Sequence, residues 1–421
     1  MMKILVSCYA CSPVRGSEPG MGWRFIRELA KEHELFVITA SKTQEQDTLI
    51  ERHVLEHPDE WVNVRFRYIP GLVEHPLDSI CPLFYYDRYR RWHQAAYRMA
   101  LAWDAEEHFD VVHQLNMVGY REPGYLWQMP QPFVWGPIGG FHIVPWCMMP
   151  SMGLRGMLFH IAYNLMNAWQ MRTLRRVRKA MNKASVLLAA TTEVQQTIRR
   201  LYGRDSVLMP EVGYEGRNAP SPALRAEGEK LRLCWSGVHE PHKALPLLLE
   251  VLRLLPRVDW ELHVIGEGAC TAAWQRRARR LGLSNIVWHG WVPREQGWRV
   301  MQQAHVFCIT SMRDLTSTVI LEALSFGLPV IAPDHCGFRN VLHEGCGRKI
   351  AIRSKRQFVK DYAAALAEWA GDETLRRRLS QGAVARAREF DWESKGQRLA
   401  ELYRTLVPSS AETVRPASIR F

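Results

Sequence analysis

Apolar residues in this chain follow two patterns that alternate along its length. Short continuous apolar runs are separated by stretches in which apolar residues recur at helical spacing. Continuous runs are typical of parallel strands that are buried on both faces of a sheet. The pattern therefore predicts an α/β protein. The expected strands are residues 3–9, 35–39, 62–69, 111–115, 133–135, 186–190, 231–236, 261–266, 286–289 and 304–310.

The order of these elements divides the chain into two α/β series. The first series ends near residues 208–213, and the proline-containing stretch 219–228 indicates a linker. We therefore predict two Rossmann-like domains, residues 1–212 and 213–390, which face a central cleft where ligands bind. Helices in the second domain are expected at 246–254, 271–281 and 295–304.

Composition narrows the class of protein. Of 421 residues, 47% are hydrophobic and 23% charged, as in folded globular proteins. The formal net charge of +12 favours an acidic partner: a nucleoside diphosphate, an anionic membrane or a nucleic acid. The nine cysteines show no complete metal-ligand spacing, and no apolar run reaches the roughly 20 residues of a membrane-spanning helix. These features predict a cytoplasmic protein without a zinc site.

Residues 304–332 form the most specific pattern: a buried strand, a polar loop, a short helix and a second buried strand. We expect Thr316, Ser317 or Thr318 to cap the helix and Gly327 to end it. A helix that begins at the carboxyl end of a parallel strand presents unpaired N–H groups to an anion. The segment therefore predicts a phosphate site.

Two acids flank the start of this helix, Asp314 before it and Glu322 about one turn inside. Carboxylates repel phosphate, so we expect them to accept hydrogen bonds from neutral hydroxyl groups. Phosphate together with hydroxyls indicates a nucleotide sugar. The alternative is a solvated Asp314 and a Glu322 that is paired with an arginine.

This segment resembles the donor site of retaining glycosyltransferases with two Rossmann-like domains, the GT-B fold, and in particular glycosyltransferase family 4. In the family's Glu-x7-Glu signature, Asp314 replaces the first Glu and Glu322 matches the second, ahead of a Gly-Leu-Pro-Val-Ile strand at 327–331. The resemblance implies that Asp314 contacts hydroxyls of the transferred sugar and Glu322 the ribose. It implies that the diphosphate is held by the backbone of Leu315, Thr316, Ser317 and Thr318.

A second family motif lies at 235–244, where the family has Gly-Arg-Leu-x-x-x-Lys-Gly with Arg and Lys on the diphosphate. Gly237 and Lys243 match this motif, but Val238 stands in place of the Arg. A lysine is a point charge and cannot form the bidentate fork of an arginine. Whether activity is weakened is left open. The resemblance also implies that Val292 contacts the base through its backbone.

The first domain supplies further candidates. In the glycine-rich loop 15–23, the resemblance places Gly16 under the donor phosphates; a tight turn before a helix is the alternative. His113 follows a strand, and it is either an active-site contact near the sugar or a core histidine. Tyr120 and Arg121 are candidates for the acceptor site.

Two segments outside the motifs bear on partners and architecture. Residues 154–181 mix apolar and basic side chains, which fits docking on anionic lipid or an ordinary helix with a solvated basic face. The resemblance implies that a last helix, about 391–407, packs back on the first domain, and we expect a disordered tail at 408–421.

Together, these features predict a retaining glycosyltransferase that moves a hexose from a UDP- or GDP-linked substrate, with Asp314, Lys243 and His113 as candidate catalytic residues. The expected acceptor is a lipid-linked saccharide or polysaccharide of cell-surface or exopolysaccharide biosynthesis, at the inner face of the membrane. No Asp-x-Asp occurs, which disfavours metal-bridged phosphate binding. The alternatives are a non-catalytic scaffold of a polysaccharide-assembly complex and a nucleic-acid binder, although an aromatic-interleaved basic motif is missing.

Overall fold

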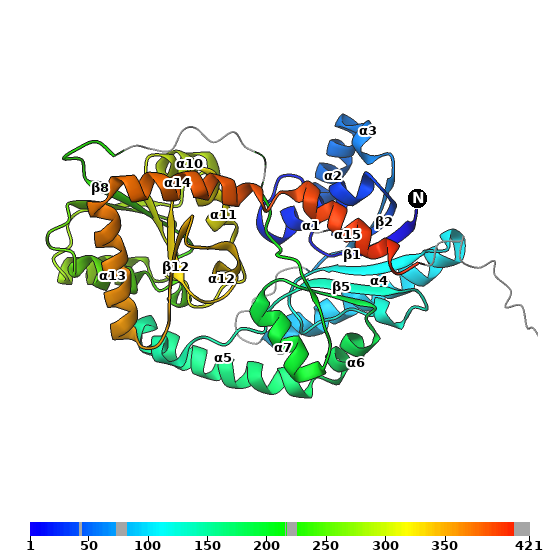
Figure 1. The fold of residues 1–421 in the computed structure, drawn as a ribbon. Coiled ribbons are helices and arrows are strands. Elements are labelled where there is room, and N and C mark those ends of the chain that lie inside the picture. Colours follow the sequence, from blue (N-terminus) through cyan, green and yellow to red (C-terminus); the bar gives the residue numbers. More distant parts are fainter. Residues whose placement is uncertain (42–43, 73–81, 215, 217–224, 408–421) are drawn as a thin grey trace, which may run out of the picture.

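The computed structural model of the protein describes residues 1–41, 44–72, 82–214, 216 and 225–407. Within these residues, the chain forms two parallel sheets, each embedded between helices (Figure 1). The predicted pair of Rossmann-like domains is confirmed. The expected tail and most of the expected linker lie outside the described residues.

The first sheet has the strand order β3-β2-β1-β4-β5-β6-β7, with neighbours paired in parallel. Its two faces contribute to separate apolar cores: Leu5 of β1 belongs to one core, and its neighbours Ile4 and Val6 to the other. This burial on both faces explains why the strands are continuous apolar runs. The strands are β1 (Lys3–Cys8), β2 (Glu34–Ser41), β3 (Val64–Pro70), β4 (Val111–Asn116), β5 (Phe133–Ile138), β6 (Val186–Ala189) and β7 (Val207–Leu208).

The second sheet has the order β10-β9-β8-β11-β12-β13 and is also parallel. In both sheets, the strand order reverses beside the first strand of the domain, and ligands of such folds bind outside the carboxyl ends of the strands at that point. In the second domain the reversal lies between β8 and β11, and the loops that follow them carry Lys243 and Asp314. The strands are β8 (Leu231–Ser236), β9 (Trp260–Ile265), β10 (Ile286–Gly290), β11 (Val306–Cys308), β12 (Val330–Pro333) and β13 (Gly347–Ile350).

Helices cover both sheets. Those that begin in the first half of the chain are α1 (Ser17–Ala30), α2 (Gln44–Glu56), α3 (Pro58–Trp61), α4 (Pro82–Glu107), α5 (Gly153–Thr173), α6 (Arg175–Lys183) and α7 (Thr192–Tyr202), with the 3-10 turns η2 (Leu126–Gln128) and η3 (Trp146–Met152). The later ones are η4 (Pro241–Lys243), α8 (Leu245–Arg253), α9 (Thr271–Arg280), α10 (Arg294–Gln302), α11 (Thr318–Ser325), α12 (Phe338–Val341), α13 (Lys355–Gly371), α14 (Glu373–Arg388) and α15 (Trp392–Arg404).

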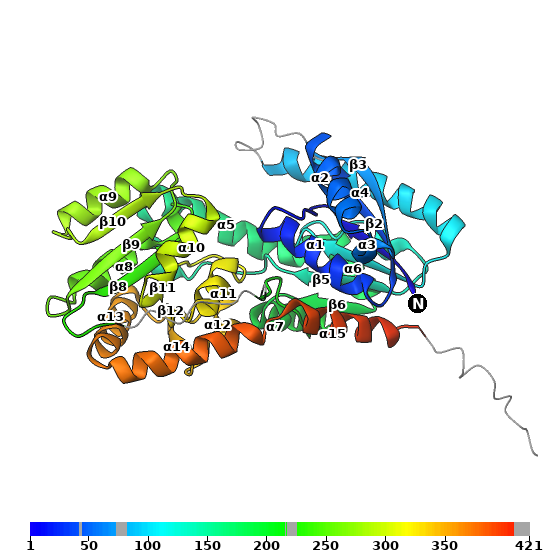
Figure 2. The same cartoon turned by 90° about the horizontal axis from the view of Figure 1, so that it is seen from above.

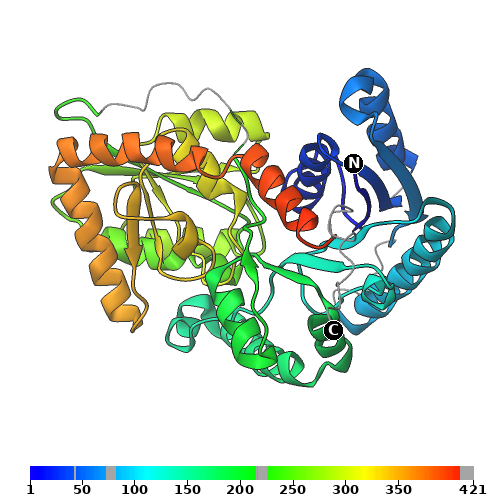
Figure 3. The same ribbon diagram turned by 45° about the vertical axis from the view of Figure 1, so that its right-hand side comes forward.

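The chain crosses between the domains at its carboxyl end. After α14 of the second domain, α15 runs onto the first domain and packs along α1 (Figures 2 and 3). The two helices approach closely, because a Cβ atom on Gly396 would lie 2.5 Å from the Cβ of Glu28. Trp392 packs edge-to-face on Phe25 of α1, with ring centroids 5.1 Å apart. The last helix is therefore a structural part of the first domain.

A second segment crosses in the opposite direction. Val144, Met148, Met149 and Met152, in and before η3, belong to the apolar core of the second domain. Met157 and Ile161 of α5 also pack against that core. Each domain thus completes its core with a segment from the other half of the chain.

Helix α1 begins earlier than the glycine-rich sequence suggests. The expected glycine-rich loop at 15–23 is wrong after Gly16, because the helix begins at Ser17. Gly20 and Gly22 lie inside the helix, where a Cβ on Gly22 would be 2.5 Å from the carbonyl oxygen of Ala10. These glycines therefore allow close packing rather than a turn.

Candidate active site

A pocket of about 800 Å³, counting space open to solvent, lies between the two domains. The loop before α1 and the start of α1 line it from the first domain, α10 and α11 from the second, and the hinge 211–214 lies between them. Gly16, Thr318 and Glu322, all predicted to bind the donor, line this one pocket. The structure therefore brings together residues that lie about 300 positions apart in the sequence.

Glu322 faces this pocket and is paired with an arginine. Its Oε1 accepts hydrogen bonds from Nη2 and Nε of Arg294, at 2.7 and 3.1 Å. The Arg294 guanidinium lies 4.6 Å above the ring of Trp298, and both residues also line the pocket. The sequence left two alternatives for Glu322, a ligand contact or an arginine partner. The structure allows both, because Glu322 is bonded to Arg294 and still lines the pocket.

Lys243 and Asp314 form an ion pair at the carboxyl end of the second sheet. Lys243 Nζ lies 2.5 Å from Asp314 Oδ2, and both side chains are about one-fifth exposed, 19% and 18%. With Ser317 they line a smaller cavity of about 240 Å³ that also borders Trp235 and Thr310. A positive charge, a carboxylate and a helix start therefore converge at one place.

The hinge acid Glu211 occupies part of the expected phosphate site. Its Oε1 accepts a hydrogen bond of 2.7 Å from the backbone N–H of Thr316, and its Oε2 accepts one of 3.0 Å from the Thr316 hydroxyl. Burial raises the pKa of Glu211 to about 7, although these hydrogen bonds favour the ionised form. The expectation that Thr316 N–H binds diphosphate is therefore wrong in this conformation, because a carboxylate of the chain takes its place.

Of the other residues in the loop 314–318, which we call the donor loop, Leu315 is used for packing, and Ser317 and Thr318 form the start of α11. Leu315 packs on the first domain, since a Cβ on Gly139 would lie 2.7 Å from its Cδ1. Helix α11 begins at Thr318, and Ser317 precedes it with a φ of 71° and no side-chain cap. The expected side-chain cap is thus wrong. The first N–H groups of α11 lack intrahelical acceptors by helix geometry, and Thr318, the first residue of the helix, lines the interdomain pocket.

Gly237 and Val292 lie beside the site and contact residues of the second domain. Gly237 N–H donates to the carbonyl of Ile265 at 3.0 Å, and a Cβ on Gly237 would lie 3.7 Å from Cδ of Lys243. Val292 packs against the apolar core around β11 and α11. Gly237 therefore lies in contact range of the lysine stem, whereas the side chain of Val292 is used for packing.

His113 is a buried core residue. One ring nitrogen, Nδ1, lies 2.6 Å from the Tyr403 hydroxyl, and Nε2 lies 2.8 Å from the carbonyl oxygen of Gly136. Burial lowers the pKa of His113 to about 4. With both ring nitrogens used and no exposed surface, the side chain does not reach a ligand. The structure supports the core alternative, and His113 is not retained as a catalytic candidate.

Tyr120 and Arg121 differ from each other. Tyr120 is fully buried, stacks on Phe141 with centroids 4.2 Å apart, and donates to Asn167 Oδ1 at 2.8 Å. Its side chain is therefore structural, contrary to the expected acceptor contact. Arg121 is half-buried and donates to Asn167 and to Gln170 of α5, at 2.5 and 2.6 Å. Arg121 alone keeps the accessibility that an acceptor contact requires.

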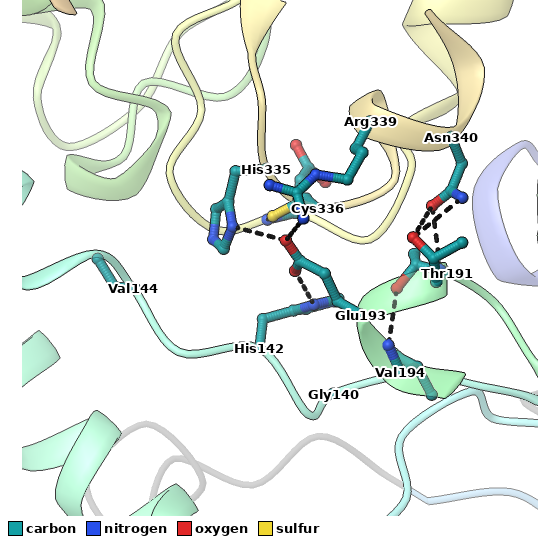
Figure 4. A network of polar contacts seen from close by, with 12 residues as sticks. Gly140, His142, Val144, Thr191, Glu193, Val194, His335, Cys336, Arg339 and Asn340 are labelled. Carbon is teal, nitrogen blue, oxygen red and sulfur yellow. Dashed lines mark hydrogen bonds and ion pairs between the residues drawn. The ribbon is translucent and has the colours of Figure 1, made fainter. Parts of the chain in front are cut away.

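A polar network joins the domains beside the donor loop (Figure 4). Glu193, at the start of α7, lies between His335 on one side and His142 on the other, at 3.1 and 3.7 Å (Figure 4). Arg339 of α12 approaches the same carboxylate at 3.9 Å. Three polar side chains, from both domains, thus meet at one carboxylate.

The network holds a charged pair near neutral pH. Burial alone would lower the pKa of His335, but Cys336 and the Glu193 carboxylate outweigh it and raise the pKa to about 10. Burial raises the pKa of the Cys336 thiol, so the charge that faces His335 is that of Glu193. Although burial opposes its ionisation, the nearby His142 and the hydrogen bond from His335 hold the pKa of Glu193 well below its usual range. An imidazolium and a carboxylate therefore link the domains.

The same network contacts the donor loop. Cys336, next to His335, accepts a hydrogen bond from the backbone N–H of Asp314, with Sγ 3.4 Å from the nitrogen. Next to Glu193, Thr192 N–H donates to Asn340 Oδ1 at 3.1 Å. The interdomain network therefore lies next to the loop that carries Asp314.

Several residues of the site are not evident from the sequence. Glu211, Arg294 and Glu193 each act through partners that are distant in sequence or on another element. One signal was available for Glu211, because it is an acid at the end of the last strand of a domain, facing the crevice side. Arg294 and Glu193 carry no comparable local signature.

Two general features complete the description. Among the described residues, one group has ligand atoms close enough to hold a metal, His53, Glu56 and His57, within 4.8 Å of one another, and none of the three lines the interdomain pocket. In the same part of the chain, no helix combines the length and apolar character needed to cross a bilayer.

Comparison with known proteins supports this picture. Residues 218–386 match the family described as "Glycosyl transferases group 1". Lipopolysaccharide 1,6-galactosyltransferase of Escherichia coli is 30% identical over 147 residues, which are 33% of this chain and 40% of that protein. Phosphatidyl-myo-inositol mannosyltransferase of Mycobacterium leprae is 26% identical over 177 residues, 41% of this chain and 46% of that protein. The chain therefore spans less than half the length of both relatives.

The fold extends over nearly the whole chain. A crystal structure of Anabaena HepE in complex with UDP and glucose superposes with a TM-score of 0.62 at 15% identity, covering 96% of this chain and all of that one, 100%. At this identity the likeness concerns the fold. The predicted GT-B architecture is confirmed.

Proposed function

We propose that this chain, whose residues 218–386 match the group 1 glycosyl transferases and which has a GT-B fold, transfers a hexose from a nucleoside diphosphate sugar to a saccharide acceptor. The observation that carries this proposal is the pocket between the domains. It joins Gly16 of the first domain to Thr318 and Glu322 of the second, next to the Lys243–Asp314 pair.

The residues divide the work of binding the donor. Lys243 and the first N–H groups of α11 bind the diphosphate, and the carboxylate of Glu322 accepts hydrogen bonds from the ribose hydroxyls. Asp314 binds hydroxyls of the sugar. Arg294, stacked on Trp298, holds the Glu322 carboxylate in place.

Transfer proceeds with retention at the anomeric carbon in this proposal. As the bond between the sugar and the diphosphate breaks, negative charge develops on the leaving oxygen, and Lys243 stabilises it. The acceptor hydroxyl attacks from the same face, and its proton passes to the departing phosphate. The protein itself supplies the positive charge at the leaving group, so the proposal requires no metal ion.

The comparisons suggest which substrates to test first. HepE is described in complex with UDP and glucose, and the two relatives are named for a lipopolysaccharide and a phosphatidylinositol. We therefore place UDP-hexoses first among donors, GDP-hexoses second, and lipid-linked saccharides or cell-surface polysaccharides first among acceptors. The reaction would take place on the cytoplasmic side, where nucleotide sugars are made.

A thermal-shift screen tests donor binding directly. A ligand at about 100 times its Kd stabilises the folded state by about 2.7 kcal/mol, so UDP-, GDP- or ADP-hexose should raise the melting temperature. Glu322→Gln should weaken this effect by roughly tenfold in Kd, because a charge-assisted hydrogen bond is lost. Glu295→Gln, an exposed acid of α10, is the matched control. If no sugar nucleotide raises the melting temperature, the proposal fails.

A scaffold without catalysis is the second candidate. Val238 is 43% exposed where the family has an arginine on the diphosphate, and Asp314 replaces a glutamate. A scaffold would bind the donor without releasing nucleoside diphosphate, either by transfer or by hydrolysis. Product release that Glu322→Gln reduces would exclude it, and the anomeric configuration of the product by NMR would test retention.

A further inference from the structure

The outer face of α5 is apolar although it is exposed. Its large apolar side chains with exposures between 47% and 70% are Leu154, Leu158, Phe159, Leu165, Met166 and Trp169. Trp146, which is 53% exposed in η3, precedes them. We call these seven side chains the α5 surface. In Figure 1, α5 runs along one edge of the molecule, below both domains, and no helix or strand of the described residues covers its outer side.

The opposite face of α5 is polar and buried. It consists of Gly156, His160, Asn164, Asn167 and Met171. Asn164 exchanges two hydrogen bonds with the backbone of Val144, at 3.0 and 2.8 Å, and Asn167 donates to the carbonyl of His142 at 2.9 Å. An ordinary surface helix turns its polar face to water, whereas the most exposed face of α5 is apolar and three polar side chains lie on its buried face. The fold therefore explains the buried polar side chains and leaves the exposed apolar ones unexplained.

The segment of the sequence that carries this surface has charges of one sign only. Between Glu122 and Glu193 the sequence contains seven arginines and lysines and no aspartate or glutamate. Exposed basic side chains flank both ends of the helix: Arg155 at its start, and Arg172, Arg175, Arg178 and Lys179 at its end and on α6. A partner for this region must combine an apolar interior with an anionic rim.

We propose that the α5 surface docks on a bilayer that contains anionic lipids, with α5 parallel to the membrane plane. Leucine, phenylalanine and methionine side chains then enter the acyl region, while Trp146 and Trp169 lie at the level of the headgroups. The flanking arginines and Lys179 bind lipid phosphates, each strengthening docking by about fivefold. A helix of 21 residues is about 30 Å long, so it presents an extended line of contact rather than a single anchor.

Docking at this face has a consequence for the cleft. Tyr163 of α5 lies between two arginines, with the Arg313 guanidinium 4.8 Å and the Arg121 guanidinium 5.8 Å from its ring centroid. Arg121 is also bonded to Asn167 on the buried face of α5. Arg121, the remaining acceptor candidate, is thus held against the helix that docks on the bilayer. This places it close to the membrane, which favours a lipid-linked acceptor. This extension rests on the proposed function, whereas docking itself does not.

Sedimentation with vesicles tests docking without any donor or acceptor. The purified full-length protein should bind vesicles of equal parts phosphatidylglycerol and phosphatidylcholine, and bind pure phosphatidylcholine much more weakly. Leu158→Ser with Trp169→Ser should reduce partitioning by more than about a hundredfold, because two large apolar side chains no longer enter the bilayer. The matched control is Leu101→Ser with Leu254→Ser, two exposed leucines of other elements.

A charge series gives a second readout. Arg175→Gln with Lys179→Gln should lower binding by roughly 25-fold at low salt, and by less at high salt, because exposed charges are screened. Arg276→Gln with Arg280→Gln, exposed on α9, is the control.

Three results would overturn the proposal. The protein could fail to bind anionic vesicles; the serine variant could bind them as well as the wild type; or the wild type could form a dimer in solution that the serine variant abolishes, which would make the α5 surface an interface between copies. Donor protection in the thermal-shift assay is scored separately, so loss of docking and loss of the glycosyltransferase assignment are distinguishable.

Discussion

The two domains use their polar side chains differently. On the wall of the second domain, Lys243, Asp314 and Glu322 are paired with charged side chains at the edge of cavities. In the first domain, by contrast, His113 and Tyr120 are fully buried and bonded within the core, and neither lines the cleft. The first set can exchange a protein partner for a ligand, and the second set cannot.

The difference follows from the free energy of breaking each contact. A partly exposed ion pair contributes on the order of 0–1 kcal/mol, so a ligand separates it at little cost. A buried donor or acceptor left without its partner costs about 1–3 kcal/mol. Charged pairs beside a cavity are therefore candidates for ligand binding, whereas buried groups that are bonded to each other stabilise the fold.

Lys243→Met would test the second-domain wall most severely. The change keeps the apolar stem but removes the charge at the leaving group, so kcat/KM should fall by about 10²–10³-fold with little change in folding. Initial rates of nucleoside diphosphate release measure this, and Lys360→Met, exposed on α13, serves as control. Activity within a few-fold of wild type would show that Lys243 is only a surface lysine.

His113→Phe tests the first domain. It leaves the Tyr403 hydroxyl and the Gly136 carbonyl without their partner, so the free energy of unfolding should fall by about 2–4 kcal/mol while the donor KM stays unchanged. Tyr403→Phe removes one of these bonds and should cost about 1 kcal/mol. A raised KM with unchanged stability would return His113 to the active site.

The pH dependence of this effect has a defined sign. Because the pKa of His113 is lowered to about 4, against about 6.5 in an unfolded chain, its neutral form is favoured by folding. Its contribution is fully present above about pH 6.5 and is lost as the pH falls toward 4. Urea unfolding of the wild type and of His113→Phe over this range should therefore converge at the acidic end.

Glu193→Gln tests the contact between the domains, with the smallest expected effect. The raised pKa of His335 means that its contribution is full below about pH 6.5 and lost as the pH rises through about 10. The lowered pKa of Glu193 means that its contribution is present above about pH 4.3 and lost as the pH falls further. The variant should lose about 1 kcal/mol near pH 6, and its stability should decline less between pH 6.5 and 10.

Urea unfolding midpoints across that range measure the effect, with Glu344→Gln, an exposed acid, as control. An unchanged pH profile would mean that the imidazolium of His335 does not depend on Glu193.

Local patterns predicted the strands and the donor loop because both are encoded by neighbouring residues. The apolar runs 231–236 and 3–9 correspond to β8 and β1, and the motif placed Glu322 at the interdomain pocket and Asp314 at the smaller cavity beside Lys243. The start of α1 was misplaced because Gly20 and Gly22 look like turn residues but serve close packing.

What could not be predicted depends on contacts between distant residues. Glu211 and Thr316 are 105 positions apart, and Glu193 and His335 are 142 apart, so no spacing reveals that each pair meets. The apolar and basic residues of 154–181 were visible in the sequence, but not which face of the helix is exposed. That face is set by Asn164 and Asn167, whose partners lie in the loop after β5.

Two segments that cross between the domains, α15 and the segment that contains η3, constrain how the chain folds during synthesis. Helix α15 reaches α1 only after residue 404 has been made, so the amino-terminal half leaves the ribosome without one of its layers. The methionines of η3, in turn, have no core to enter until β8 and α8 exist. A gene split at residue 212 should therefore yield two insoluble halves that recover solubility when expressed together.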